Sequence, residues 1–142
     1  MSDDLTGAPR NRLKDKLAAG EVCASMIVRL SRGSEIARIA KTAGFDALYV
    51  DLEHSTLTLE AASQICMTAV DLDVTPLVRV AGPMSEAIGR ILDGGALGVI
   101  APGVENAEDA RQVVARAKYP PIGRRSASSA DSPGRRSRAD RH

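Results

Sequence analysis

The feature that most constrains the fold of this chain is a regular alternation of short apolar segments with amphipathic ones. The short segments are almost continuously apolar, which is typical of parallel strands buried on both faces. The segments between them carry apolar residues at helical spacing, which is typical of helices that pack on such a sheet. The strand candidates span residues 22–30, 48–51, 76–80 and 97–101. The sequence therefore predicts an α/β protein with a parallel sheet.

Capping residues mark where the expected helices begin and end. Ser, Thr and Asn side chains accept hydrogen bonds from the first-turn N–H groups of a helix, and Gly favours the backbone conformation that ends one. Asn106 precedes one helical pattern, Gly44 follows another, and either Ser55 or Thr58 caps a third. The expected helices span residues 11–17, 36–43, 59–69, 85–92 and 107–117.

Four strand–helix units fit two architectures, a doubly wound open sheet or the first half of a (β/α)8 barrel. A complete barrel takes about 250 residues, and this chain has 142. The barrel interpretation therefore predicts about half of one. We expect a flexible N-terminus over residues 1–10, a partial barrel domain over residues 11–122 and a tail over residues 123–142.

The tail differs abruptly in composition from the rest. Residues 123–142 hold six Arg against Asp131 and Asp140, and they contain no Val, Ile, Leu or aromatic residue. Such a segment cannot contribute a core, so we expect it to be disordered. One interpretation is a basic arm for nucleic acid or anionic lipid. The other, which we favour because the remaining residues carry a net charge of −3, is a natural continuation lost by frameshift or truncation.

Composition excludes several classes of partner. The chain has one Phe, two Tyr and no Trp, which argues against nucleic-acid binding by base stacking. No apolar run is long enough to span a membrane, and the N-terminal residues lack the apolar core of a signal peptide. Cys23 and Cys66 do not form a close pair and are read as two thiols of a reducing compartment. We therefore expect a cytoplasmic protein without nucleic-acid or membrane partners.

Charged residues gather where two successive strands end. Asp51, Glu53 and His54 close one strand, and Arg79 lies near the end of the next. An unpaired charge inside a buried strand is costly, whereas the carboxyl ends of parallel strands are where α/β enzymes build active sites. The pattern therefore predicts an enzyme site at this end of the sheet.

Each of these residues also has a structural interpretation. Arg79 pairing with Asp51 or Glu53 as a buried ion pair would look the same in the sequence. His54 fits a loop histidine or a partner of the next helix, and Glu53 is read as structural. The stretch D-G-G-A-L-G at residues 93–98 lacks the spacing of a phosphate-binding loop and predicts a helix end followed by a tight turn.

Four short motifs occur in order along the chain: D-x-E-H at 51–54, V-R-V at 78–80, L-D-G-G-A at 92–96 and Y-P-P-x-G-x-R at 119–125. Together they resemble the N-terminal half of the HpcH/HpaI aldolases, over residues 11 to about 126. These are metal-dependent class II aldolases of TIM-type barrel fold. The resemblance implies an aldehyde-lyase that cleaves 4-hydroxy-2-oxo acids to pyruvate and an aldehyde.

The resemblance also implies roles for individual residues. His54 matches the histidine that transfers protons through water, and Asp51 matches the carboxylate that orients it. Arg79 matches the arginine that binds the pyruvate carbonyl oxygen and stabilises the enolate, and Arg125 is a further candidate for substrate binding. The aromatic residue usual on the first strand is replaced here by the run S-M-I-V at residues 25–28.

The implied metal is the main departure from the family. The resemblance implies Mg²⁺ or Mn²⁺ held by a Glu and an Asp on later strands, which this sequence does not match. Asp131 and Asp140 lie in the tail and do not correspond to them. A hard divalent cation needs several oxygen ligands, so we expect no complete metal site and weak or absent activity.

The alternative is a half-barrel without catalytic function. Four parallel strands leave both outer strands with unpaired backbone groups and uncovered apolar side chains. Such a half-barrel would self-associate, pair with another subunit or aggregate.

Overall fold

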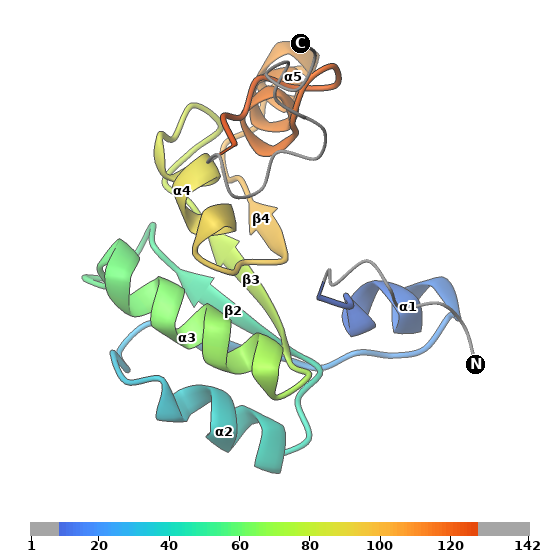
Figure 1. The fold of residues 1–142 in the computed structure, drawn as a ribbon, viewed down its shortest axis with the longest axis vertical. Coiled ribbons are helices and arrows are strands. Elements are labelled where there is room, and N and C mark those ends of the chain that lie inside the picture. The colour runs from blue at the N-terminus through green and yellow to red at the C-terminus, as the bar shows by residue number, and fades with distance from the viewer. Residues whose placement is uncertain (1–8, 128–142) are drawn as a thin grey trace, which may run out of the picture.

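A computed structural model of the chain describes residues 9–127 (Figure 1). Within them, four parallel strands form one sheet in the order β1-β2-β3-β4, and helices alternate with the strands along the chain. The strands are β1 (Ser25–Val28), β2 (Ala47–Asp51), β3 (Thr75–Arg79) and β4 (Gly98–Ile100). The helices are α1 (Arg12–Ala18), α2 (Glu35–Thr42), α3 (Leu59–Asp71), α4 (Ala87–Asp93) and α5 (Ala107–Ala117).

The strand order decides between the two expected architectures. Every connection steps to the next strand in the same direction, and right-handed crossovers then place all the connecting helices on one face of the sheet. Helices α2, α3 and α4 form that layer (Figure 1), with α3 packed between α2 and α4. A doubly wound sheet would carry helices on both faces. The α/β class and the partial barrel are therefore confirmed.

The main core lies between the sheet and this helical layer. Leu48 and Val50 of β2 and Ile65 of α3 are completely buried. Side chains alternate between the faces of a strand, so Tyr49 lies on the opposite, inner face. The register places Ile27, Leu77 and Gly98 beside it in one row. Ile27 is 58% exposed there, which shows that the inner face is only partly covered.

Strand β1 is shorter than the sequence predicts. Its ladder with β2 pairs residues 25–28 only, and Val22 and Leu30, which the pattern included, are 94% and 92% exposed. The physical reason is that, in the part of the chain that the structure describes, β1 pairs on one side only, with the first four residues of β2. The apolar sequence of an edge segment can continue beyond the last residue that has a backbone partner, so the apolar pattern overestimates the length of the strand.

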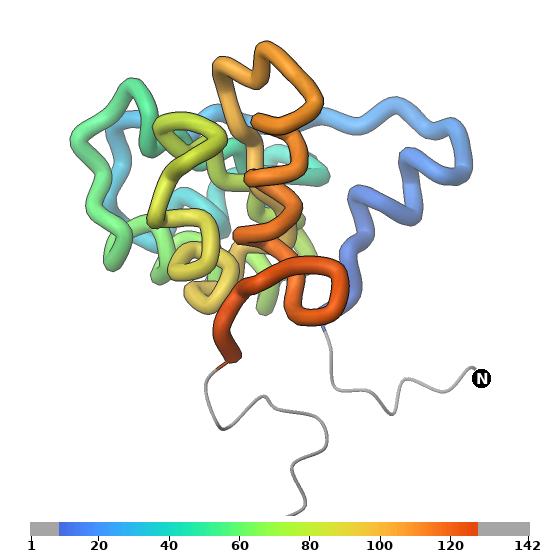
Figure 2. Tube along the Cα trace, turned by 90° about the horizontal axis from the view of Figure 1, so that it is seen from above, coloured from blue at the N-terminus to red at the C-terminus, as the bar shows by residue number. Residues whose placement is uncertain are grey.

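Helix α1 lies across the start of the strands, apart from the other helices (Figure 2, blue). The Leu13 N–H donates to Thr75 Oγ1 over 3.2 Å at the first residue of β3. Lys16 Nζ lies 2.7 Å from Asp46 Oδ1, just before β2. This contact raises the pKa of Lys16 and lowers that of Asp46. Helix α1 therefore closes the N-terminal end of the sheet and leaves the carboxyl end open.

Most of the expected helix ends are confirmed. Thr58, not Ser55, caps α3, because its Oγ1 accepts from the Ala61 N–H. Asn106 caps α5 in the same way. Helix α4 ends at Asp93 and the chain turns through Gly95, whose φ of +98° suits a glycine. The D-G-G-A-L-G stretch is thus a helix end and a turn.

The two ends of the chain are described only in part. Residues 1–8 and 128–142 lie outside the described residues, so the flexible N-terminus and most of the predicted tail remain predictions. The first residues of that tail are described: the Arg124 N–H donates to the Ala115 carbonyl of α5 over 2.7 Å. No described helix is long and apolar enough to cross a membrane.

Candidate active site

Charged side chains from three neighbouring strands meet at the carboxyl end of the sheet. Asp51 is the last residue of β2 and pairs in register with Arg79, the last residue of β3. Val28 of β1 pairs with Val50, so Arg29 reaches the level of Asp51. The sequence pattern predicted that Asp51 and Arg79 would lie together, and the register brings them side by side.

The centre of the site is a two-point ion pair. Arg79 Nε donates to Asp51 Oδ1 over 3.0 Å, and Arg79 Nη2 donates to Asp51 Oδ2 over 2.7 Å. The Asp51 side chain is completely buried, whereas that of Arg79 is 22% exposed. The Arg79 guanidinium holds the pKa of Asp51 far below its ordinary range, against the opposing effect of burial. Asp51 is therefore a carboxylate, and it raises the pKa of Arg79 in turn.

The D-x-E-H motif is a turn built on the Asp51 side chain. The backbone N–H groups of Glu53 and His54 donate to Asp51 Oδ1 over 2.9 and 3.2 Å. Ser55 Oγ donates to the Asp51 carbonyl oxygen. Asp often folds the following residues in this way, because its short side chain accepts from nearby backbone N–H groups. The spacing of the motif is thus explained by the turn that presents His54.

The His54 side chain stands at the rim of the site, 59% exposed. Its Nε2 lies 3.4 Å from Glu53 Oε2, and the same Glu53 oxygen lies 3.3 Å from Arg79 Nε. Asp51 contacts the backbone of His54, while Glu53 contacts the imidazole. Glu53, read as structural from the sequence, therefore links the two side chains for which the resemblance implies chemistry.

Arg29 is the member of the site that sequence reasoning missed. Its Nη2 donates to the His54 carbonyl oxygen over 2.9 Å, and its Nε lies 3.3 Å from Asp51 Oδ2. The expected strand extended to residue 30, which placed Arg29 inside a strand and hid its position at the end of one. A strand ending at Val28 would have aligned Arg29 with Asp51.

Arg125 lies elsewhere. Its side chain is 13% exposed, forms an ion pair with Asp93 and packs over the Tyr119 ring at 4.7 Å. Asp93 ends α4, where the chain turns back toward the start of β4. That is the opposite end of the sheet from Asp51 and His54. The structure therefore does not bring Arg125 together with the other three predicted site residues.

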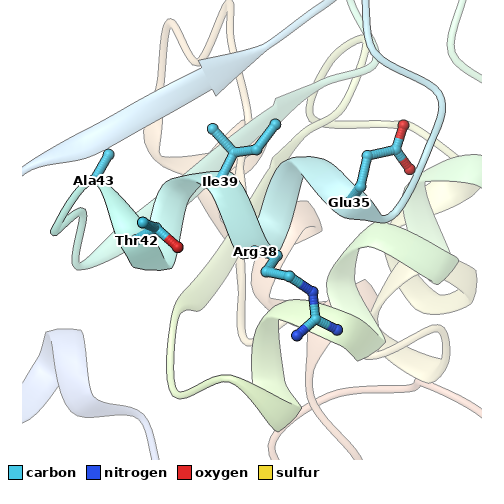
Figure 3. A pocket seen from close by; sticks show the side chains of 5 residues that line it. All are labelled: Glu35, Arg38, Ile39, Thr42 and Ala43. Carbon is cyan, nitrogen blue, oxygen red and sulfur yellow. The ribbon is translucent and has the colours of Figure 1, made fainter.

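Two hollows matter for what the molecule could bind. One of about 450 Å³ lies beside His54 and is lined by Arg29, Leu30, His54, Ser55 and Thr56. The other, about 440 Å³, lies along α2 and is lined by residues of that helix, including Ile39, and by Ala43 directly after it (Figure 3). Only the first adjoins the charged cluster.

The residues of the cluster do not fit a divalent metal. In the described part of the chain, no three His, Cys, Asp or Glu side chains are placed to hold an ion. Both oxygens of Asp51 already accept from N–H donors, which leaves no carboxylate set of the kind that Mg²⁺ requires.

Cys66, a free thiol as expected, is buried in the core, and burial raises its pKa to about 12.

Known proteins resemble this chain in sequence and in fold. Residues 24–133 match the HpcH/HpaI aldolase/citrate lyase family. A 4-hydroxy-4-methyl-2-oxoglutarate aldolase of Hapsidospora irregularis is 45% identical over 122 residues, which are 84% of this chain and 44% of that protein. A 2-keto-3-deoxy-L-rhamnonate aldolase of Escherichia coli is 34% identical over 115 residues, 81% of this chain and 43% of that protein.

A solved structure agrees with these sequence matches. The crystal structure of an HpcH/HpaI aldolase from Desulfitobacterium hafniense superposes with a TM-score of 0.77 at 37% identity, covering 83% of this chain and 46% of that one. The chain thus spans less than half the length of the relatives that it matches.

Asp51→Asn tests whether the ion pair holds this end of the sheet. We expect the variant to lose about 3 kcal/mol of unfolding free energy at pH 7, because Arg79 and Arg29 then lose the buried carboxylate that both contact. Urea unfolding measures the loss. Asp73→Asn is the matched control: Asp73 forms an exposed ion pair with Arg12, and Asn tolerates its positive φ. The control should lose less than about 1 kcal/mol.

The contribution of Asp51 to stability should depend on pH in a defined direction. Its pKa is lower in the folded protein than the ordinary value of 3.8. As the pH falls, Asp51 therefore takes up a proton in the unfolded chain at a higher pH than in the folded protein. The contribution is complete above that value and is lost as the pH falls toward the folded pKa. We expect the stability gap between wild type and Asp51→Asn to narrow from about pH 5 to pH 2. A gap that stays constant over this range would contradict the assignment.

Proposed function

Because this chain belongs to the HpcH/HpaI aldolase/citrate lyase family, we propose that it carries half of the active site of a class II pyruvate aldolase. The reaction is the cleavage of a 4-hydroxy-2-oxo acid to pyruvate and an aldehyde. The observation that supports the proposal is the meeting of Asp51, His54 and Arg79 at the carboxyl ends of β2 and β3. The relatives named above are called aldolases of substrates in this chemical class.

Arg79 is the residue that binds the 2-oxo acid. Asp51 engages its Nε and Nη2, and the Tyr49 ring lies 5.4 Å from its guanidinium carbon. Among the described residues, its Nη1 group has no hydrogen-bond acceptor. The ion pair therefore fixes the guanidinium and leaves an edge for substrate oxygens. A fixed cation at that point favours the enolate, because negative charge develops there as the carbon–carbon bond breaks.

His54 is the residue that takes the proton. A neutral imidazole accepts the proton of the C4 hydroxyl, the C4 oxygen becomes the aldehyde carbonyl, and the C3–C4 bond breaks. The electron pair of that bond goes to the pyruvate enolate, which then takes a proton at C3 from the imidazolium, so that the imidazole is neutral again at the end of the reaction. Glu53, close to Nε2 of His54, stabilises the imidazolium that forms.

Several expectations remain predictions beside this proposal. The resemblance implies Mg²⁺ or Mn²⁺, and the described residues do not supply its ligands, so no metal-dependent step is assigned to them. Arg125, paired with Asp93, stays outside the proposed site. A cytoplasmic location also stays a prediction, as does the absence of nucleic-acid partners.

Pyruvate release, coupled to lactate dehydrogenase, tests the lyase chemistry. With 4-hydroxy-2-oxoglutarate as substrate, with and without Mn²⁺, we expect slow release, at least 100-fold below the ~10 s⁻¹ of a typical enzyme. His54→Ala should lower the remaining rate about 100-fold, because it removes the proton acceptor. Gln64→Ala changes an exposed residue of α3 that lies outside the site and should keep the wild-type rate.

Three results would contradict this expectation. Release near 10 s⁻¹ would show that the site is complete in this chain, and release that persists in His54→Ala would remove the role of His54. No release from folded wild-type protein would show that the half-site in this chain does not catalyse the cleavage by itself.

A second candidate function, assembly with another copy, is favoured by the uncovered inner face. Ile27 of the edge strand β1 and the flanking Val22 and Leu30 are exposed, and within residues 9–127 β4 pairs only with β3. Two copies related by a twofold axis would place β1 of each beside β4 of the other and close a sheet of eight parallel strands. The α5 helix of one copy would then lie near the apolar hollow on α2 of the other (Figure 3).

Light scattering after size exclusion tests this assembly. We expect the wild type to form a dimer that dissociates on dilution, and Ile27→Lys to be monomeric, because the new ammonium group would be buried at the interface. Met67→Lys is the matched control: Met67 is 59% exposed against 58% for Ile27, but it lies on the outer helical layer. A wild type that is monomeric at every concentration, or an Ile27→Lys variant that still dimerises, would overturn the assembly.

A further inference from the structure

Arg29 occupies a position from which a third functional side chain can reach the substrate. It comes from the end of β1, on the far side of β2 from Arg79, and both arginines contact the same oxygen, Asp51 Oδ2. Their guanidinium groups therefore meet over one carboxylate. The Arg29 side chain is 52% exposed, against 22% for Arg79. Arg29 is thus the outer of the two cations.

The Arg29 guanidinium keeps hydrogen-bonding capacity after its contacts within the protein. Its Nε and Nη2 face the His54 carbonyl oxygen, and its Nη1 group has no acceptor among the residues that the structure describes. A guanidinium has five N–H donors in a planar fork, a geometry that matches a carboxylate. The outer edge of Arg29 is therefore suited to a carboxylate ligand.

The hollow beside Arg29 has the charge that such a ligand needs. None of its five lining residues is an Asp or a Glu. Arg32 brings a second cation to the same loop, since its Nη2 donates to Thr56 Oγ1 over 2.7 Å. Asp51, the nearest carboxylate to Arg29, is already paired with Arg79 at shorter range. The hollow is therefore a positively charged recess of about 450 Å³.

We infer that Arg29 and this recess form a subsite for the second carboxylate of a dicarboxylic 2-oxo acid. The inference rests on the proposed function, in which Arg79 binds the 2-oxo acid end and His54 takes the proton of the C4 hydroxyl. His54 also lines the recess, so the group attached to C4 extends into it. Arg29 then determines specificity, favouring substrates whose aldehyde half carries a carboxylate.

The alternative role for Arg29 is structural support of the loop that carries His54. Its bonds to the His54 carbonyl oxygen hold the loop that carries the imidazole. If Arg29 only supports the loop, replacing it should change the affinity for every 2-oxo acid equally. If Arg29 forms a subsite, replacing it should change the affinity only for 2-oxo acids with a second carboxylate. Two ligands of the same length separate these roles: 2-oxoglutarate, a diacid, and 2-oxopentanoate, which lacks the second carboxylate.

Titration of the protein with each ligand, followed by the imidazole proton resonances in NMR, measures the two dissociation constants. His54→Ala identifies the His54 resonance. We expect 2-oxoglutarate to bind about tenfold more tightly than 2-oxopentanoate, because a charge-assisted hydrogen bond is added. Arg29→Gln should remove this preference and leave the affinity for 2-oxopentanoate within about twofold.

Three further variants complete the test. Arg29→Lys keeps the charge but loses the fork, so it should retain part of the preference. Arg38→Gln removes an arginine of α2 that lines the other hollow and should change neither constant. Arg79→Gln should weaken both ligands, because both share the 2-oxo acid end. Circular dichroism checks that each variant is folded.

The outcomes separate the subsite from the proposed function. Equal binding of the two ligands by the wild type, or equal weakening of both by Arg29→Gln, overturns the subsite alone. Failure of the wild type to bind either ligand, or unchanged binding by Arg79→Gln, overturns the proposed function and the subsite with it.

Discussion

The Asp51 carboxylate is the group on which this end of the molecule depends. It ends β2, pairs with Arg79 of β3, lies within ion-pair distance of Arg29 after β1, and accepts the N–H groups of the turn that carries His54. A completely buried carboxylate is costly unless donors surround it. The requirement to satisfy Asp51 therefore brings three strand ends and one loop to a single point.

The structural and catalytic interpretations of these residues do not compete. A strand-end ion pair was the alternative to a substrate-binding role for Arg79, and the structure contains that pair. Because Asp51 uses Nε and Nη2, the pair orients the guanidinium without using all of its donors. The same contact that contributes to stability thus prepares the proposed binding edge. Arg29 contacts Asp51 from the other side through its Nε, and it too keeps N–H donors that Asp51 does not use.

The two faces of the sheet show why the chain has a well-formed core and an uncovered surface at once. The outer face is covered by α2, α3 and α4, and its residues, such as Val50 and Val78, are fully buried. Among residues 9–127, no second half of a barrel lies against the inner face, and Ile27 is exposed there. The relatives named above are more than twice as long as the segment that they share with this chain.

The sequence by itself determined the element order, the class of fold and the gathering of Asp51 and Arg79 at one end of the sheet, because apolar periodicity and strand-end charges are local patterns. It did not determine where β1 ends, since that strand is limited by its pairing with four residues of β2, and Arg29 was missed for this reason. Nor did it separate Arg125 from the site, because an arginine in a motif looks the same whichever end of the sheet it reaches. Only the tertiary structure decided these points, since they depend on which distant backbone lies beside each residue.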